Sequence, residues 1–201
     1  MPNPDEAVVR RVLAQNERDV RIRFCIEKAW EDLKLKYTDM AWWRRKSTTR
    51  AIMWENSVQS VLAELSGDNG IRSVPHDDTI SFIADDLVRF RLKKAALSLF
   101  TSNFPTPLAG LFHTHEADLF GHAGHHRVEI VHVFNRFQTA LDWIGVVGRE
   151  KKEILWKFEL PRGGASIEAL PPVVPTKPAS DSVLSPAAKT GQDTKTNEDK
   201  K

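Results

Sequence analysis

The stretch "RVEIVHVFNRFQTALDWIGVVGREKKEILWKFEL", residues 127–160, contains the clearest strand pattern in the chain. Runs rich in apolar and aromatic residues extend over Arg127 to Phe134, Ala140 to Val147 and Ile154 to Leu160. In the last run apolar residues occupy every second position, which is typical of a strand that buries one face. Because the connections between the runs are short, we expect the three strands to form an antiparallel meander.

Three shorter strand runs precede this stretch: Ile71 to Val74, Thr79 to Ala84 and Leu87 to Lys93. Asp85 and Asp86 favour a tight turn between the last two runs. In the third run apolar residues alternate with Arg89, Arg91 and Lys93. Since successive side chains of a strand point to opposite faces, we expect one face to join the core and the other to be strongly cationic.

Helical patterns lie on either side of these strands. From about Asp5 to Tyr37 apolar residues recur at steps of three and four, and the polar run Gln15 to Asp19 predicts a break in the helix. A second helix is expected to begin with N-caps among Ser47, Thr48 and Thr49, to extend to Leu65 and to stop at Gly67. A third helix is expected from Thr106-Pro107 to about Gly121.

The expected fold is therefore α+β, with an N-terminal helical pair packed on a mixed or antiparallel sheet and the order α-α-β-β-β-α-β-β-β. We divide the chain into an N-terminal amphipathic helix (1–40), an α+β core domain (41–160) and a tail (161–201). The tail is rich in Pro, Ala, Ser and Lys and has no aromatic residue. Such a composition cannot bury enough apolar surface to offset the entropy of ordering, so we expect disorder.

Bulk charge and cysteine content point to no special environment. Twenty-nine Lys and Arg residues against 27 Asp and Glu leave a net charge of +2, which predicts neither nucleic acid nor an acidic substrate. The single cysteine, Cys25, has no disulfide partner. No apolar run approaches the roughly 20 residues of a membrane-spanning helix. We expect a cytoplasmic protein without a membrane partner.

The stretch "HTHEADLFGHAGHH", residues 113–126, contains five histidines, and histidine is the commonest transition-metal ligand. On a helix, His113 and His115 would lie about 200° apart around the axis and could not share a metal. The histidines that remain as possible co-ligands are His122, His125 and His126. No H-E-x-x-H spacing accompanies them, so a metal-dependent hydrolase is an alternative beside a solvated histidine-rich loop. We expect His132 to be an ordinary strand residue.

A basic segment, "WWRRKSTTR", residues 42–50, suggests a second kind of site. It combines two tryptophans with four cations, which are Arg44, Arg45, Lys46 and Arg50. If these cations shared a face with the basic side of the third strand, they would form a phosphate-binding patch with stacking partners nearby. A solubilising strand face and a basic loop with buried tryptophans would give the same pattern.

Catalytic motifs are weak. The order of helix, three strands, helix and strand matches restriction-endonuclease-like cores, in which the third strand should carry a metal-binding carboxylate before a lysine. Here Arg91-Leu92-Lys93 places arginine at that position, so a degenerate, nucleic-acid-binding version is the alternative that remains. Cys25 has no histidine nearby in sequence, and no Gly-x-Ser-x-Gly elbow is present. We therefore expect neither a catalytic residue nor a cofactor.

Two stretches, "VRFRLKKAALSLFTSNFPTPLAGLF" (88–112) and the meander at 127–160, resemble a group of uncharacterised bacterial proteins. The pattern of that group is a basic strand, Ser-Asn-x-Pro-Thr opening a helix, and a meander that ends in Trp-x-x-x-Leu. It is matched by Ser102, Asn103, Pro105, Thr106, Trp156 and Leu160. The resemblance covers roughly residues 45–160.

The resemblance implies a protein of phage, plasmid or toxin–antitoxin-like loci, encoded beside helix-turn-helix regulators and metallopeptidase-like proteins. We therefore expect a non-catalytic interaction or regulatory protein of a bacterial accessory locus, with a protein partner and with nucleic acid as the other possibility. Asn103 and Thr106 should cap a helix N-terminus, which favours anions. Together with the basic strand, these two residues are the expected binding site.

Overall fold

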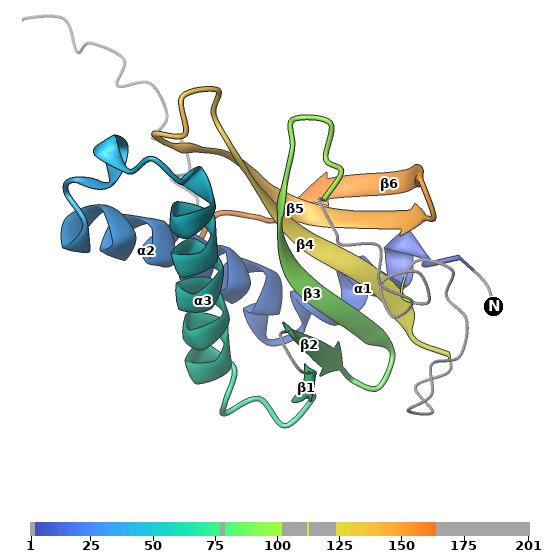
Figure 1. The fold of residues 1–201 in the computed structure, drawn as a ribbon. Helices are drawn as coiled ribbons and strands as arrows, with labels where there is room; N and C mark the ends of the chain where they lie inside the picture. Colours follow the sequence, from blue (N-terminus) through green and yellow to red (C-terminus); the bar gives the residue numbers. More distant parts are fainter. Residues whose placement is uncertain (1–2, 77–78, 102–111, 113–123, 164–201) are drawn as a thin grey trace, which may run out of the picture. The chain divides into compact units, whose positions relative to one another are not determined.

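The meander expected from residues 127–160 forms one half of a six-stranded sheet. In this computed structural model the described residues are 3–76, 79–101, 112 and 124–163 (Figure 1). The strands are β1 (Ile71–His76), β2 (Thr79–Ala84), β3 (Val88–Ala95), β4 (His126–Phe134), β5 (Leu141–Glu150) and β6 (Glu153–Glu159). They lie side by side in sequence order.

The sheet is mixed. Neighbouring strands run antiparallel except β3 and β4, which are parallel over eight residue pairs from Val88–His126 to Ala95–Val133. Parallel neighbours require a long crossover connection, and the chain supplies one between Ala95 and His126. The fold is therefore of the α+β class, as expected, with the mixed rather than the antiparallel sheet.

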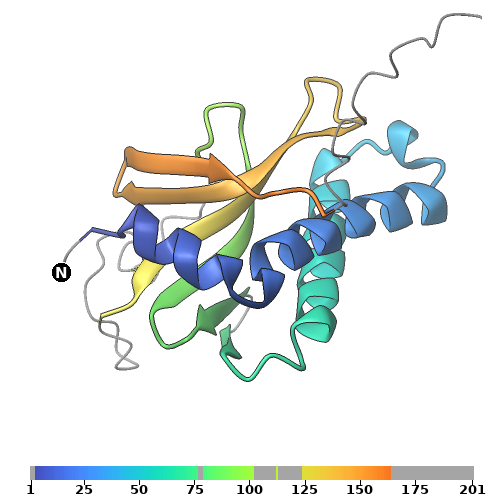
Figure 2. The same ribbon diagram turned by 180° about the vertical axis from the view of Figure 1, so that it is seen from behind.

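The helices cover one face of this sheet. α1 (Glu6–Ala14) and α2 (Arg18–Lys36) lie behind the sheet in Figure 1 and in front of it in Figure 2. The third helix, α3 (Lys46–Glu64), follows a 3-10 turn, η2 (Met40–Trp42), and packs beside α2 and β3. Because a helix that lies on a sheet must bury its apolar stripe there, this arrangement places the core between the two layers.

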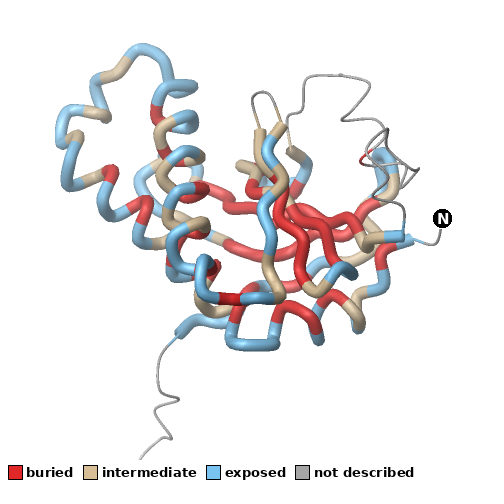
Figure 3. Tube along the Cα trace, turned by 90° about the horizontal axis from the view of Figure 1, so that it is seen from below, coloured by how far each residue is buried: buried red, intermediate tan, exposed pale blue. Residues whose placement is uncertain are grey.

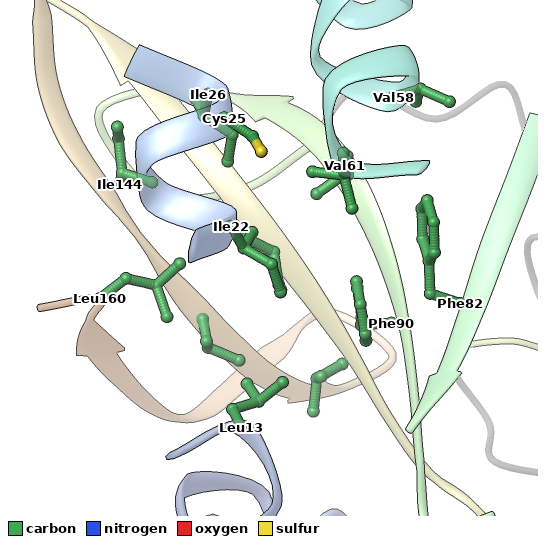
Figure 4. Close-up of a cluster of buried hydrophobic side chains, with 14 of the residues drawn as sticks. Leu13, Ile22, Cys25, Ile26, Val58, Val61, Phe82, Phe90, Ile144 and Leu160 are labelled. Atoms are coloured by element: carbon green, nitrogen blue, oxygen red, sulfur yellow. The ribbon is translucent and has the colours of Figure 1, made fainter. Parts of the chain in front are cut away.

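The core joins the N-terminal segment to the sheet. Ile22 and Ile26 of α2 belong to the same buried cluster as Phe90 of β3 and Ile144 of β5 (Figure 4). Figure 3 shows buried residues along the central strands and on the sides of the helices that face them. Residues 1–40 and 41–160 therefore share one core and have no boundary between separate cores.

The break predicted between Gln15 and Asp19 is confirmed. A 3-10 turn, η1 (Gln15–Glu17), separates α1 from α2, and Asn16 and Glu17 have left-handed φ angles of 52° and 54°. The first residue of α2, Arg18, is buried and pairs with Asp68 and Asp85, each at 2.7 Å. This charge network ties the helix break to the loop before β1 and to the β2–β3 turn.

The predicted extent of α3 to Leu65 agrees with its C-cap, but the predicted N-cap and the glycine stop are wrong. The helix begins at Lys46, with Arg45 as an N-cap whose side chain makes no capping hydrogen bond, so Ser47, Thr48 and Thr49 lie inside the first turn. It ends at Glu64, and Gly67 lies beyond it without a left-handed φ. The backbone N–H of Asp68 donates to the carbonyl of Leu65 here, so the chain turns without a glycine C-cap.

The predicted turn at Asp85 and Asp86 is confirmed: both residues have left-handed φ angles, and the backbone N–H of Leu87 donates to the carbonyl of Ala84 at 3.0 Å. Three residues separate the paired residues Ala84 and Val88. The expected helix over 106–121 lies outside the described residues, apart from Phe112, and so does the tail beyond Gly163. Among the helices that the structure describes, none combines the length and the hydropathy needed to cross a membrane.

Candidate functional site

The alternation predicted for β3 is confirmed, but its outer face is not a solvent-facing cationic surface. Phe90 and Leu92 enter the core, while Arg89, Arg91 and Lys93 point to the other face of the sheet. Arg89 is only 1% exposed. Its Nε donates to Ser81 Oγ at 3.1 Å, so the neighbouring strand covers and binds this side chain. The expectation that Arg89 is open to phosphate is therefore corrected.

The pairing of β3 with β4 adds two buried charged residues that the sequence analysis missed. Arg127 lies opposite Arg89, and Glu129 lies opposite Arg91, so all four side chains share one face. Arg127 and Glu129 are both almost fully buried. Every second residue of β4 reaches this face, but only the strand register shows which β3 residues they meet.

Glu129 is held by groups from two other segments. Arg149 of β5 forms an ion pair with Glu129 through Nη2 at 3.0 Å, and Thr101 Oγ1 donates to both carboxylate oxygens at 3.2 and 3.1 Å. Burial lowers the pKa of Lys93, against the opposing effect of Glu129. Arg91 lies with its guanidinium carbon 4.1 Å from the centre of the Phe112 ring. We call this set the arginine face: Arg89, Arg91, Lys93, Thr101, Arg127, Glu129 and Arg149.

The basic segment at 42–50 lies on a different side of the protein. Arg44, Arg45, Lys46 and Arg50 are all exposed. They precede or begin α3, which packs against the core side of the sheet, whereas the arginine face lies on the opposite side. The two basic clusters therefore do not form the single patch considered from the sequence. Burial lowers the pKa of Lys94 in β3, and the charge of Arg50 lowers it further.

The tryptophans of this segment differ in burial. Trp43 is half-buried and packs edge-on against Tyr37, with ring centres 5.3 Å apart. Trp42 is 86% exposed. A second large aromatic residue, Phe137 in the β4–β5 turn, is 79% exposed. The interpretation in which both tryptophans are buried is therefore wrong for Trp42.

A groove connects these two regions at the end of the molecule that is uppermost in Figures 1 and 2. It has a volume of about 320 Å³. We call it the loop-end groove, and its lining comes from α2, the η2 region, the start of α3 and the β4–β5 turn: Lys34, Met40, Ala41, Lys46, Thr49, Phe137, Gln138 and Thr139. No sequence motif predicts this groove, because its walls are more than 85 residues apart in the chain.

The histidines considered as metal ligands do not converge where the structure describes them. His126 accepts a hydrogen bond from the backbone N–H of Asp5 at 3.1 Å through Nδ1, so it faces α1. His125 precedes the first residue of β4. No group of three or more His, Cys, Asp or Glu residues suited to a metal is found in the described ranges. His122, Asn103 and Thr106 lie outside these ranges.

Two buried titratable residues are inert at neutral pH. His132 lies in β4, as expected, and burial lowers its pKa to about 4, with a smaller contribution from Lys94. Burial raises the pKa of Cys25 to about 11, so its thiol stays protonated. A protonated, buried thiol is a poor nucleophile.

No model of a known protein family, no curated protein and no solved structure matches this chain. A functional assignment therefore depends on the chemistry of the chain's own residues. In the loop-end groove the exposed aromatic side chain of Phe137 lies beside aliphatic and cationic side chains.

Proposed function

We propose that this chain is a non-catalytic interaction protein whose partner docks at the loop-end groove. The observation that carries the proposal is the exposure of Phe137, which lines this groove, and of Trp42, which directly follows the lining residue Ala41 in the chain. Large aromatic side chains that remain exposed beside a cavity are typical anchors of binding interfaces, because contact with a partner removes their apolar surface from water.

The composition of the groove supports binding without catalysis. Its walls contain aliphatic, aromatic, hydroxyl, amide and amine groups, and the described residues that line it include no carboxylate, imidazole or thiol. Lys46 at its wall, with Arg44, Arg45 and Arg50 nearby in sequence, favours an anionic partner, whereas Lys34 is paired with Glu31 at 2.8 Å.

In this proposal the protein acts in the cytoplasm as a regulatory component of a bacterial accessory locus, of the mobile-element, defence or toxin–antitoxin-like kind. The support is the resemblance of residues 45–160 to proteins encoded in such loci. A protein encoded beside it is one class of partner and nucleic acid is the other.

Site-specific crosslinking tests whether the groove is the docking surface. The photo-reactive residue p-benzoylphenylalanine replaces Phe137 in the full chain, and a matched protein carries it at Phe24, which is 57% exposed on α2 and does not line the groove. We expect a partner to crosslink at position 137 and not at position 24. The double substitution Trp42→Ala with Phe137→Ala should weaken binding of the identified partner by at least about tenfold.

Equal crosslinking from both positions, or unchanged affinity of the double variant, would contradict docking at the groove. Circular dichroism of each variant checks that the fold is retained, as expected for substitutions of exposed side chains.

A further inference from the structure

Building on the proposed function, we infer that the loop-end groove binds single-stranded nucleic acid. Bases stack on Trp42 and Phe137, while the phosphates follow the cations of the basic segment. This combination of a cationic track with exposed aromatic rings is the one by which proteins bind single strands without strong sequence preference.

One continuous stretch at this end, between Asp39 and Glu55, carries cations alone. Residues 40–54 contain four cations and no Asp or Glu. Arg44, Arg45 and Arg50 form no ion pair within the described part of the chain. Lys46 donates to the backbone carbonyl of Ala41 at 3.2 Å, a contact that leaves its charge uncompensated. The positive potential of the segment is therefore available to a phosphate backbone.

The two aromatic rings are carried by hydrogen-bonded turns. In the β4–β5 turn, Asn135 accepts from the backbone N–H of Thr139 and donates to its hydroxyl, both at 2.8 Å. In η2, the backbone N–H of Trp42 donates to the carbonyl of Asp39 at 2.9 Å. Because both backbones are fixed before binding, a stacked base loses its own freedom but does not have to order either turn.

The exposure of these rings favours bases over an acidic peptide. A flat base can cover a ring that projects into solvent, whereas a peptide side chain gains most when it enters a pocket. A nucleic-acid duplex keeps its bases stacked on one another, so it presents phosphates to the cations but no base faces to Trp42 and Phe137. Preference for a single strand over a duplex therefore follows from the aromatic part of the site.

Fluorescence anisotropy of the full-length protein with a labelled 12-residue oligothymidylate tests this inference, with a duplex of the same length and an oligoglutamate peptide as competing probes. If all four cations contact phosphates, raising the salt concentration from 50 to 200 mM should weaken single-strand binding by about 50-fold. Arg44→Glu with Arg45→Glu should reduce the slope of log affinity against log salt by about half. Lys28→Glu with Lys152→Glu, which changes two exposed lysines elsewhere, should leave the slope unchanged.

Substitution of the rings gives an independent readout. Trp42→Ala and Phe137→Ala should each weaken oligothymidylate binding by about tenfold without changing the salt slope, and Phe24→Ala should have no effect. Equal affinity for the duplex, tighter binding of the peptide, or equal effects of the control and test variants would overturn the inference. Should a protein partner crosslink at position 137 while no oligonucleotide binds, the inference fails and the proposed function stands.

Discussion

His132 places a polar ring in the apolar layer between the helices and the sheet. It lies on β4 beside Phe134, with ring centres 5.2 Å apart, and its Nε2 has no hydrogen-bond partner among the described residues. A neutral imidazole tolerates such surroundings far better than a charged one, which is why burial lowers its pKa to about 4. The residue therefore contributes to stability only while it is uncharged.

We predict that acidification lowers the free energy of unfolding because His132 binds a proton at a higher pH in the unfolded chain than in the fold. In the unfolded chain the imidazole binds a proton near pH 6.5, but in the fold it does so only near pH 4. The full free energy of unfolding is therefore present above about pH 6.5. It decreases as the pH falls towards 4, where about 3 kcal/mol has been lost. Chemical denaturation between pH 7 and pH 4 measures this loss, and His132→Phe should flatten that part of the curve.

The buried carboxylate of Asp68 affects stability in a different pH range from His132. Its hydrogen bond from Arg18 holds the pKa of the carboxyl below its usual range, so its contribution is lost only as the pH falls below about 4. A His132→Phe protein that still lost stability between pH 6.5 and 4, as the unmodified protein does, would show that another group is responsible.

At the scale of the elements, the strands follow their sequence pattern closely and the helix ends do not. The strand predicted from Thr79 to Ala84 has the same bounds as β2, and Asp85-Asp86 predicted the turn between β2 and β3. The N-cap of α3 was placed two residues late because Ser47 is a good N-cap in isolation, whereas Arg45 holds that position. The helix therefore begins without a capping side chain, an interaction that typically contributes about 1 kcal/mol.

The pairing of β5 with β6 depends on a glycine that makes room for an aromatic ring. A Cβ added at Gly148 would lie 2.3 Å from the Trp156 ring. We predict that Gly148→Ala lowers the free energy of unfolding by about 1–3 kcal/mol, because ring or strand must shift. Urea denaturation provides the measurement.

Two further variants show whether the clash is the cause. Gly67→Ala, where no atom lies within 4 Å of the added Cβ, should be neutral or slightly stabilising. Combining Gly148→Ala with Trp156→Ala should cost less than the sum of the two single substitutions. Simple additivity would mean that the glycine has another role.

At the scale of the whole molecule, the parallel contact between β3 and β4 joins two antiparallel halves into one sheet. The hairpins of each half are local, but this contact joins residues about 38 positions apart, such as Phe90 and Val128. It brings Arg89 beside Arg127 and Arg91 beside Glu129, so it creates the arginine face. No residue at either strand predicts that pairing by itself.

The shared core leads to a prediction about fragments. The α2 side chains Ile22, Ile26 and Leu33 are at most 1% exposed, so residues 41–163 alone would expose the apolar face that they cover. We predict that this fragment shows no cooperative unfolding transition, whereas residues 1–165, the compact unit, unfold cooperatively. Thermal denaturation followed by circular dichroism distinguishes them, and a cooperative transition of the 41–163 fragment would contradict a single core.

The sequence by itself determined the α+β class, the C-terminal meander, the β2–β3 turn and the break before Arg18. Each of these depends on residues close together in the chain, where side-chain period and backbone preference act directly. Only the tertiary structure decided that Arg89 is buried, that Arg127 and Glu129 join it, and that Phe137 meets the basic segment at one groove. Burial and juxtaposition depend on contacts between distant segments, which local patterns do not encode.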